Sequence, residues 1–290
     1  GGRLPRGSAV LFLLLHAALR AFDFLSNFCE EEVRRVMLRG IFTQARCFSA
    51  ETRQAFLASV EAGTSGLPDH PRFARKENVK LGSSVLVPLV DGGSPALPPS
   101  VLFTKRSTSL RAHRGEVCFP GGKAEKGESL VQTALRETEE ETGLGASSIS
   151  VWSPIQPVLT SLLDRAVTPV VGYLHDPHCL QSLQISHDEV VSVFSVPISH
   201  LLSVVSSTLF VHPKFRYRLP AFPVRNFTVH AKSGVSCGMG TVNEGDDCCG
   251  LQNAFIPAEF RIWGLSAVIL HQVLCHLEPE RYKAVQVMFR

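Results

Sequence analysis

The sequence predicts an α/β fold in which helices pack on a sheet as a sandwich. Short apolar runs rich in β-branched residues, such as 84–90 and 168–174, are bounded by Gly, Pro and polar turns and indicate strands. In the stretches 131–142 and 265–277, apolar residues recur every three or four positions, which indicates helices. Strands mixed with a few helices, without internal repeats, are typical of an α/β sandwich.

Composition sets the first limits on function. The chain has 290 residues, enough for one sizeable domain plus extensions. Its formal net charge of +3 is too small for a general binder of nucleic acids or membrane surfaces, so we expect neither partner. The eight cysteines form no CxxC pair and no regular framework, which favours reduced thiols in an intracellular compartment.

Two N-terminal segments resemble targeting signals. Residues 9–18 are apolar but shorter than the ~20 residues that cross a bilayer, and no clear cleavage site of a secretory signal follows them. The segment 37–54 is basic, amphipathic and free of acids before Glu51, which predicts a mitochondrial transit peptide. Arg46 fits a processing site between Phe48 and Ser49. We therefore expect residues 1–48 to be upstream and targeting sequence, and the protein to be mitochondrial, in the matrix.

The remaining chain divides into a helix with a linker over 49–82 and a globular domain over 83–290. Residues 226–258 are rich in Gly, Cys and polar residues without a sustained period, and predict a flexible surface insertion. The other expected elements, in chain order, are a helix over 51–62, strands over 84–90, 101–104, 117–119, 151–159, 168–174 and 189–196, a short helix over 198–204, strands over 217–224 and 260–263, and a closing helix over 265–277.

The stretch 121–144 carries the clearest chemistry. Two glycines and a polar turn lead into a helix in which Glu137, Glu140 and Glu141 are spaced i, i+3 and i+4, so their carboxylates share one face. Like charges at this spacing repel by roughly 0.2–0.5 kcal/mol per pair. A divalent cation such as Mg²⁺ reverses this effect, because it takes oxygen ligands and usually also binds substrate phosphates. A solvated acidic face is the ordinary alternative, but the glycine turn and the helix stop at Gly143 favour a phosphate-processing site.

This stretch resembles the box of the Nudix hydrolases, which reads Gly, five residues, Glu, seven residues, Arg-Glu-aliphatic-x-Glu-Glu-x-Gly-aliphatic. Thr138 stands where an aliphatic residue is usual, and we expect its hydroxyl to bond the carbonyl one turn back so that the helix still packs. The resemblance implies the Nudix fold, an α/β/α sandwich with a mixed central sheet. The matching residues are Gly122, Glu128, Arg136, Glu137, Thr138, Glu140, Glu141, Gly143 and Leu144.

The preceding segment, 101–122, gathers several basic residues. On charge alone a basic surface loop is the more ordinary interpretation, but the segment leads directly into the glycine turn, where cations could lie beside a bound phosphate. The segment resembles the signature of the coenzyme A diphosphatase branch of the Nudix hydrolases, and 215–222 and 261–269 resemble the mitochondrial member of that branch. The resemblance makes Lys105, Arg106, Arg111 and His113 the candidates for binding substrate phosphates.

The resemblance implies hydrolysis of the pyrophosphate bond of coenzyme A or acyl-coenzyme A, giving 4′-phosphopantetheine or its acyl form and 3′,5′-ADP. The implied cofactor is Mg²⁺ or Mn²⁺, held by Glu137, Glu140, Glu141 and the Gly122 carbonyl. Arg136 is expected to orient Glu137 through a salt bridge rather than to touch the substrate.

Three questions stay open at this point. Glu189, just before an expected strand, is either a further ligand or general base or an ordinary exposed glutamate, so the candidate catalytic residues are Arg136, Glu137, Glu141 and Glu189. The substrate could instead be another nucleoside diphosphate derivative such as ADP-ribose or NADH, or the chain could be a non-catalytic nucleotide-binding module. The sequence also leaves a homodimer open.

Overall fold

The computed structural model describes residues 48–63, 80–92, 97–110, 113–160, 165–212, 215–233, 240–241 and 260–282. The chain divides into two units, Gly1–Arg46 and Cys47–Arg290, and every described residue lies in the second. Apart from Phe48, the expected targeting sequence lies outside the described residues. The same is true of Arg111 and of most of the expected insertion over 226–258.

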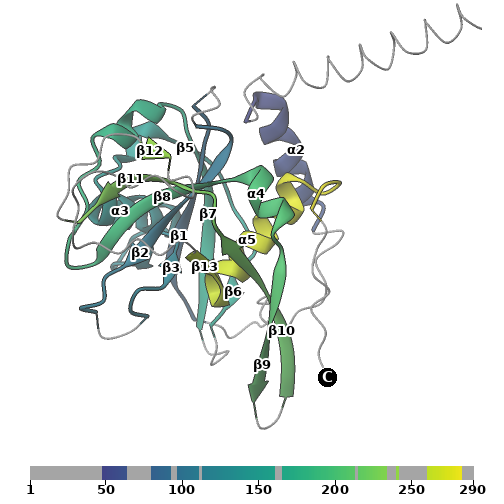
Figure 1. Ribbon diagram of the computed structural model, residues 1–290. Helices are drawn as coiled ribbons and strands as arrows, with labels where there is room; N and C mark the ends of the chain where they lie inside the picture. The colour runs from purple at the N-terminus through teal and green to yellow at the C-terminus, as the bar shows by residue number, and fades with distance from the viewer. Residues whose placement is uncertain are drawn as a thin grey trace, which may run out of the picture. The chain divides into compact units, whose positions relative to one another are not determined.

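A mixed sheet forms the body of this unit. Within the described residues it has ten strands, in the order β12–β11–β8–β2–β1–β7–β5, with β3, β4 and β6 paired to β2, β1 and β7 (Figure 1). β1 and β7 pair in parallel over ten positions of β1, and the other pairs of this sheet are antiparallel. The strands are β1 (Lys80–Val90), β2 (Ser100–Arg106), β3 (Val117–Cys118), β4 (Gly121–Lys123), β5 (Ile149–Pro154), β6 (Val158–Leu159), β7 (Arg165–Leu174), β8 (Val190–Pro197), β11 (Thr228–Lys232) and β12 (Gly240–Thr241).

A second, smaller sheet and the helices complete the unit. The smaller sheet has the order β13–β10–β9, with β9 at Ser206–His212, β10 at Phe215–Val224 and β13 at Phe260–Ile262. The helices are α2 (Ala50–Glu61), α3 (Leu130–Thr142), α4 (Ile198–Ser203) and α5 (Gly264–Leu277), and the short 3₁₀ helices are η1 (Ala146–Ser148) and η2 (Pro177–Gln181).

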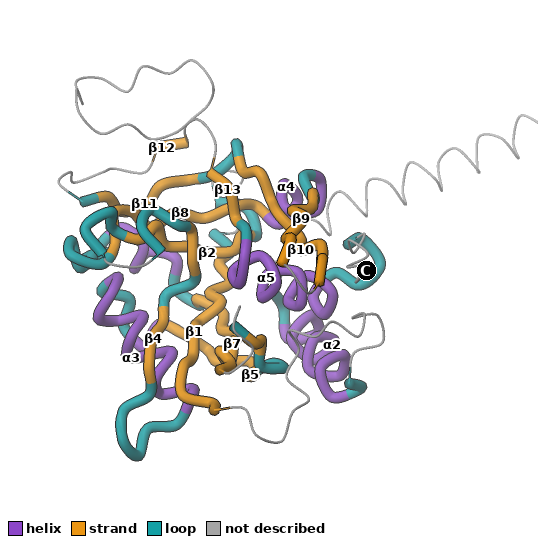
Figure 2. Tube along the Cα trace, turned by 90° about the horizontal axis from the view of Figure 1, so that it is seen from below, coloured by secondary structure: helices purple, strands orange, loops and turns teal. Residues whose placement is uncertain are grey.

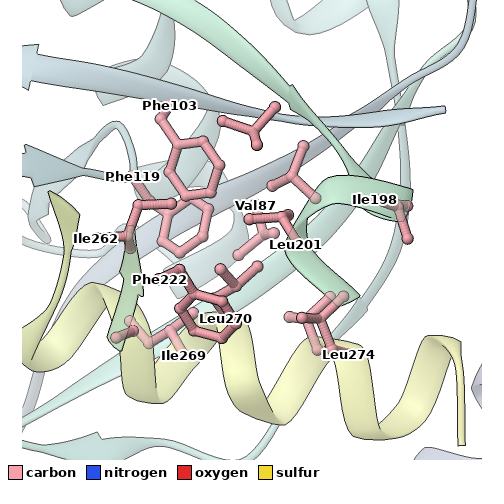
Figure 3. Close-up of a cluster of buried hydrophobic side chains, with 14 of the residues drawn as sticks. Val87, Phe103, Phe119, Ile198, Leu201, Phe222, Ile262, Ile269, Leu270 and Leu274 are labelled. Atoms are coloured by element: carbon pink, nitrogen blue, oxygen red, sulfur yellow. The ribbon is translucent and has the colours of Figure 1, made fainter. Parts of the chain in front are cut away.

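The main sheet buries a different cluster of side chains on each face. Along β1, Leu86 and Val90 point toward α3, whereas Val87 and Leu89 point toward α5, as the two-residue period of a strand requires. We call these the α3 face and the α5 face. Figure 2 shows α3 on one side of the sheet and α5 with α2 on the other. Figure 3 shows the α5-face cluster, in which strand side chains meet α5, β10 and β13. The predicted α/β/α sandwich with a mixed sheet is confirmed.

Helix α2 belongs to this core, although the sequence placed it with a linker. Phe56 is buried and its ring lies 5.5 Å from that of Trp152 and 5.8 Å from that of His276 on α5. Ser59 Oγ lies 2.9 Å from His276 Nδ1. Phe48, next to the expected processing site, is also buried, with its ring 6.0 Å from that of Trp152. The globular unit therefore begins before the predicted boundary at residue 83.

Three expectations about strands are wrong in part. Residues 228–232, predicted to lie in a surface insertion, form β11 and pair with β8. The register of that pair shifts at His230, and this bulge breaks the alternation that would have revealed the strand. The single strand expected over 151–159 is two strands, β5 and β6. Strand β9 was not predicted at all.

Candidate functional site

The two glycines that open the box lie against β1 and α3. Gly121 has φ of +151°, and a Cβ at this residue would come within 2.3 Å of the Ser84 carbonyl oxygen. A Cβ on Gly122 would lie 2.3 Å from the carboxylate carbon of Glu137. Both positions therefore require glycine, and the second does so because a glutamate from α3 occupies the space that a side chain would need.

Helix α3 starts and stops where the sequence predicted. Ser129 and Gln132 form a reciprocal capping box at its N-terminus, and Gly143, with φ of +74°, ends it in the left-handed conformation. Thr138 Oγ1 donates to the Ala134 carbonyl at 2.6 Å, which confirms the bond expected for this departure from the usual pattern. Because both ends are fixed, the glutamates of the helix have a defined register on the sheet.

Arg136 and Glu128 form a clamp between the loop and the helix. The guanidinium donates to both carboxylate oxygens of Glu128, at 2.9 and 3.2 Å, and to the Lys123 carbonyl at 3.1 Å. Glu128 also accepts from Thr133 Oγ1 and the Glu125 amide. The hydrogen bonds from Arg136 are the main reason why the pKa of Glu128 falls to about 2. With its oxygens satisfied in this way, Glu128 holds the loop to the helix.

The three glutamates predicted to bind a metal point in different directions. Arg136 donates to Glu137 Oε1 at 3.1 Å, which is the expected salt bridge, and to Glu140 Oε2 at 2.9 Å. The Glu137 side chain is 18% exposed and that of Glu140 is 58% exposed. Glu141 is only 3% exposed and faces the sheet. The structure thus brings Glu137 and Glu141 inward and leaves Glu140 on the outer side, bound to Arg136.

Glu141 is the most perturbed of these groups. Its Oε2 is buried and has no hydrogen-bond partner among the described residues. Burial is the main reason why its pKa rises to about 8; the nearby Arg106 opposes the rise, while Glu189 and Glu137 add to it. A buried carboxylate with an unsatisfied oxygen and two acidic neighbours is a place where a cation would be stabilising.

The donor set fits a hard divalent cation in its chemistry, although it is not closed around one. Glu137, Glu141 and the Gly122 carbonyl offer oxygen atoms, and the unsatisfied Oε2 of Glu141 lacks a positive partner. Across the described ranges, no three His, Cys, Asp or Glu side chains come together as a ready metal cluster. Glu140 would have to leave Arg136 to join the other two glutamates.

Glu189 lies where the sequence suggested, immediately before β8. Its backbone carbonyl accepts from the Ser107 amide at 2.8 Å, which ties it to the end of β2. Its side chain is exposed, yet its charge is close enough to raise the pKa of Glu141. It therefore belongs to the same acidic group as Glu137 and Glu141.

The basic residues predicted to bind phosphate do not form one cluster. Arg106 lies on the α3 face near Glu141, and its Nε is buried without a hydrogen-bond partner among the described residues. Lys105, the preceding residue of β2, lies on the α5 face with Nζ 5.1 Å from the centre of the Phe260 ring. His113 is exposed and bonds Glu116 at 3.0 Å. Arg111 lies outside the described residues, so only Arg106 is placed beside the predicted metal ligands.

Sequence reasoning missed two features of this region. Cys118 on β3 lies against Thr104, with Sγ 3.2 Å from Oγ1, and burial raises the pKa of its thiol to about 11. It faces Glu141 and Arg106, and the alternation of β3 opposite β2 was the available signal. On the outer side of α3 there is also an open depression of about 550 Å³, and no spacing in the sequence pointed to it. Its lining residues are Glu128, Gln132, Leu135, Arg136, Glu139, Glu140 and Ala146.

The helices have the lengths of a globular domain. Of those in the described ranges, none combines the length and the apolar character that crossing a bilayer needs. The longest buried helix, α5, has 14 residues and packs inside the α5 face.

Comparison with known proteins agrees with the geometry of the box. The model of the NUDIX domain matches residues 80–210. A Nudix hydrolase 3 from Caenorhabditis elegans is 38% identical over 242 residues, which is 82% of this chain and 90% of the relative. The mitochondrial coenzyme A diphosphatase NUDT8 of Homo sapiens is 32% identical over 243 residues, or 82% of this chain and 83% of the relative.

More distant similarities cover less of the chain. The peroxisomal coenzyme A diphosphatase NUDT7 of Mus musculus is 40% identical over 136 residues, or 47% of this chain and 51% of the relative. The crystal structure of an Ap4A hydrolase binary complex from C. elegans aligns with a TM-score of 0.33 and 19% identity over 40% of this chain and 80% of the other, and adds nothing further. The glutamate helix, its glycine turn and relatives that match most of their own length lead to one conclusion: the chain belongs to the Nudix hydrolases.

Proposed function

We propose that this Nudix hydrolase cleaves the pyrophosphate bond of coenzyme A and acyl-coenzyme A. The products are 4′-phosphopantetheine, or its acyl form, and 3′,5′-ADP. The observation that supports hydrolysis is Glu141, buried with an unsatisfied oxygen beside Glu137, Glu189 and Arg106. Coenzyme A as the substrate is supported by the signature over 101–122 and by the names of the human and mouse relatives.

A pyrophosphate resists hydrolysis because its negative oxygens repel a nucleophile. Nudix hydrolases generally use divalent metal ions; Mg²⁺ or Mn²⁺ held by Glu137, Glu141 and the Gly122 carbonyl would neutralise that charge and lower the pKa of a water. Glu140 is the further ligand if it exchanges Arg136 for the cation.

The other residues of the site position and accept. Arg136 holds Glu137 in place through the bond at 3.1 Å. Arg106 brings a positive charge to the face where the diphosphate would lie, and guanidinium groups bind phosphate oxygens in pairs. Glu189 is exposed next to Glu141, so it can meet solvent and take a proton from an attacking water.

The direct test is a product assay on the purified chain. Coenzyme A, acetyl-coenzyme A, ADP-ribose and NADH are each incubated with Mg²⁺, with Mn²⁺ and with a chelator, and the products are separated by chromatography. We expect metal-dependent release of 3′,5′-ADP from both coenzyme A substrates. Faster cleavage of ADP-ribose or NADH would assign the enzyme to those substrates instead. Binding without any cleavage would indicate a nucleotide-binding module.

We also propose that the protein works in the mitochondrial matrix. The basic, acid-poor segment before Glu51 supports this, as do the human and mouse relatives that are named mitochondrial. N-terminal sequencing of the protein recovered from the matrix tests the proposal. A first residue within 37–48 supports processing on import, and recovery from peroxisomes alone would contradict it.

A further inference from the structure

Three polar side chains form a row across β2, β8 and β11. Lys105 on β2 is directly opposite Ser192 on β8, and Ser192 is directly opposite Lys232 on β11. Residues opposite one another in antiparallel strands point to the same face, and neighbouring strands are ~4.8 Å apart. The row is on the α5 face, because Lys105 is two residues from buried Phe103 and Ser192 is two residues from buried Phe194.

Lys105 is held in a setting that disfavours an isolated positive charge. Its Nζ lies 5.1 Å from the centre of the Phe260 ring, and that ring stacks on Phe194 at 4.5 Å. Within the described ranges, no carboxylate forms an ion pair with Lys105. Burial, and then the charge of Lys232, lowers the pKa of its ammonium. Like charges on adjacent positions of a sheet destabilise it, so an anion between them would be stabilising.

Ser192 adds a neutral donor between the two lysines. The residue is 5% exposed, and its hydroxyl makes no hydrogen bond in the described part of the chain. A hydroxyl at this depth usually has a partner, because burying it unpaired costs free energy. Two ammonium groups and one hydroxyl, all on one face, are the donors that a phosphate group needs.

We propose that Lys105, Ser192 and Lys232 bind a phosphate monoester that the substrate carries apart from its scissile diphosphate. On the proposed function, on which this inference rests, that group is the 3′-phosphate of coenzyme A. The site is at the end of the sheet that also carries the acidic group. Arg106, the residue after Lys105, lies near Glu141, and Glu189 precedes the strand of Ser192 by three positions. ADP-ribose and NADH lack this monoester.

The first test measures binding of two nucleotides to the full chain by calorimetry. 3′,5′-ADP carries the monoester and 5′-AMP does not, so their difference isolates it. We expect Lys105→Ala and Lys232→Ala each to weaken 3′,5′-ADP roughly tenfold, the loss of one charge-assisted hydrogen bond, and to leave 5′-AMP within about twofold. Lys105→Arg and Lys232→Arg keep the charge and should restore most of the affinity. Arg281→Ala, which removes an exposed cation at the end of α5, is the matched control and should change neither.

The second test separates this inference from the proposed function. The KM for coenzyme A and for dephospho-coenzyme A is measured for the wild type and Lys232→Ala, with thermal unfolding to confirm folding. A KM raised roughly tenfold for coenzyme A alone supports the site. Equal changes for both substrates, or none, overturn it while wild-type cleavage of coenzyme A keeps the proposed function. A wild type that cleaves neither substrate overturns the proposed function, and selective loss of 3′,5′-ADP binding would then still support the phosphate site.

Discussion

On the α5 face of the main sheet, the side chains between the strands and α5 are mostly aromatic and aliphatic, and Phe103, Phe194 and Phe222 are completely buried. The α3 face buries Glu141 instead, with one carboxylate oxygen that has no hydrogen-bond partner among the described residues. Arg106 Nε, on the same face, is in the same condition. One sheet therefore carries a face that obeys the usual rules of burial and a face that departs from them.

The departure indicates where function resides. A buried polar group without a partner costs about 1–3 kcal/mol, and a chain keeps such groups mainly where chemistry needs them. The α3 face gives up stability in order to hold charges, and the α5 face supplies the stability. Gln272 on α5 is an exception, because its buried amide has no partner in the described ranges, and nothing in the structure explains it.

The largest expected effect is on the α3 face. Glu141→Gln should lower kcat for coenzyme A by about 10³-fold or more, because the amide keeps the volume but cannot carry the charge that binds a cation. The melting temperature should not fall, since a buried charge has been removed. Glu139→Gln, at an exposed position of the same helix, is the control and should remain active. Wild-type turnover by Glu141→Gln with Mg²⁺ would remove the distinction between the faces.

The α5 face should respond in the opposite way. Phe222→Ala should lower the free energy of unfolding by about 3–5 kcal/mol, because it leaves a cavity among side chains from β10, α4 and α5 (Figure 3). The molecules that remain folded should keep their kcat. Urea unfolding monitored by circular dichroism measures the loss, and Phe222→Leu should cost less. A loss under about 1 kcal/mol for the alanine variant would mean that this face is not the main source of stability.

Acid should weaken the α5 face through His271. This histidine is buried against Tyr282, with Nδ1 2.8 Å from the hydroxyl oxygen, and burial lowers its pKa to about 4. Because the folded pKa is below the unfolded value of about 6.5, the unfolded state binds the proton first as the pH falls. Stability is therefore lost between about pH 6.5 and pH 4, by about 2 kcal/mol at pH 5.

The variant His271→Gln isolates this contribution. Unfolding free energies of wild type and variant are measured at several pH values, and the variant should show the smaller loss on acidification. His230, which is also buried with a lowered pKa, contributes equally to both proteins and cancels in the comparison. Parallel curves for the two proteins would show that His271 does not titrate in this way.

The smallest expected effect concerns the start of the folded unit. A chain that begins at Ser49 lacks Phe48, whose ring lies against Trp152 and 5.6 Å from the ring of Tyr173. It should be less stable by about 2 kcal/mol than a chain that begins at Phe48, which is the cost of losing one buried aromatic side chain. Denaturant unfolding compares the two, and kcat should be unchanged. Equal stabilities would show that processing after Phe48 has no structural cost.

Much of the candidate site could be predicted because its signals are local. The start of α3 at a capping serine, its end at Gly143 and the bond from Thr138 to the preceding turn depend on residues within one or two helical turns. The salt bridge between Arg136 and Glu137 joins neighbours in the chain. The spacing of the box, which led to the family, is likewise a property of one continuous stretch.

The rest depended on what packs against each residue, which spacing does not encode. Glu137, Glu140 and Glu141 share a helical face, yet Glu141 is buried and Glu140 is exposed, because only one side of that face meets the sheet. Burial and charges from other strands then set the pKa of Glu141. The chain placed Lys105 and Arg106 together, and strand pairing separated them onto opposite faces. The sequence by itself determined the helix, its carboxylates and the family; tertiary structure decided which carboxylate is buried and which cations face it, because burial and Coulomb interactions act through space between residues far apart in the chain.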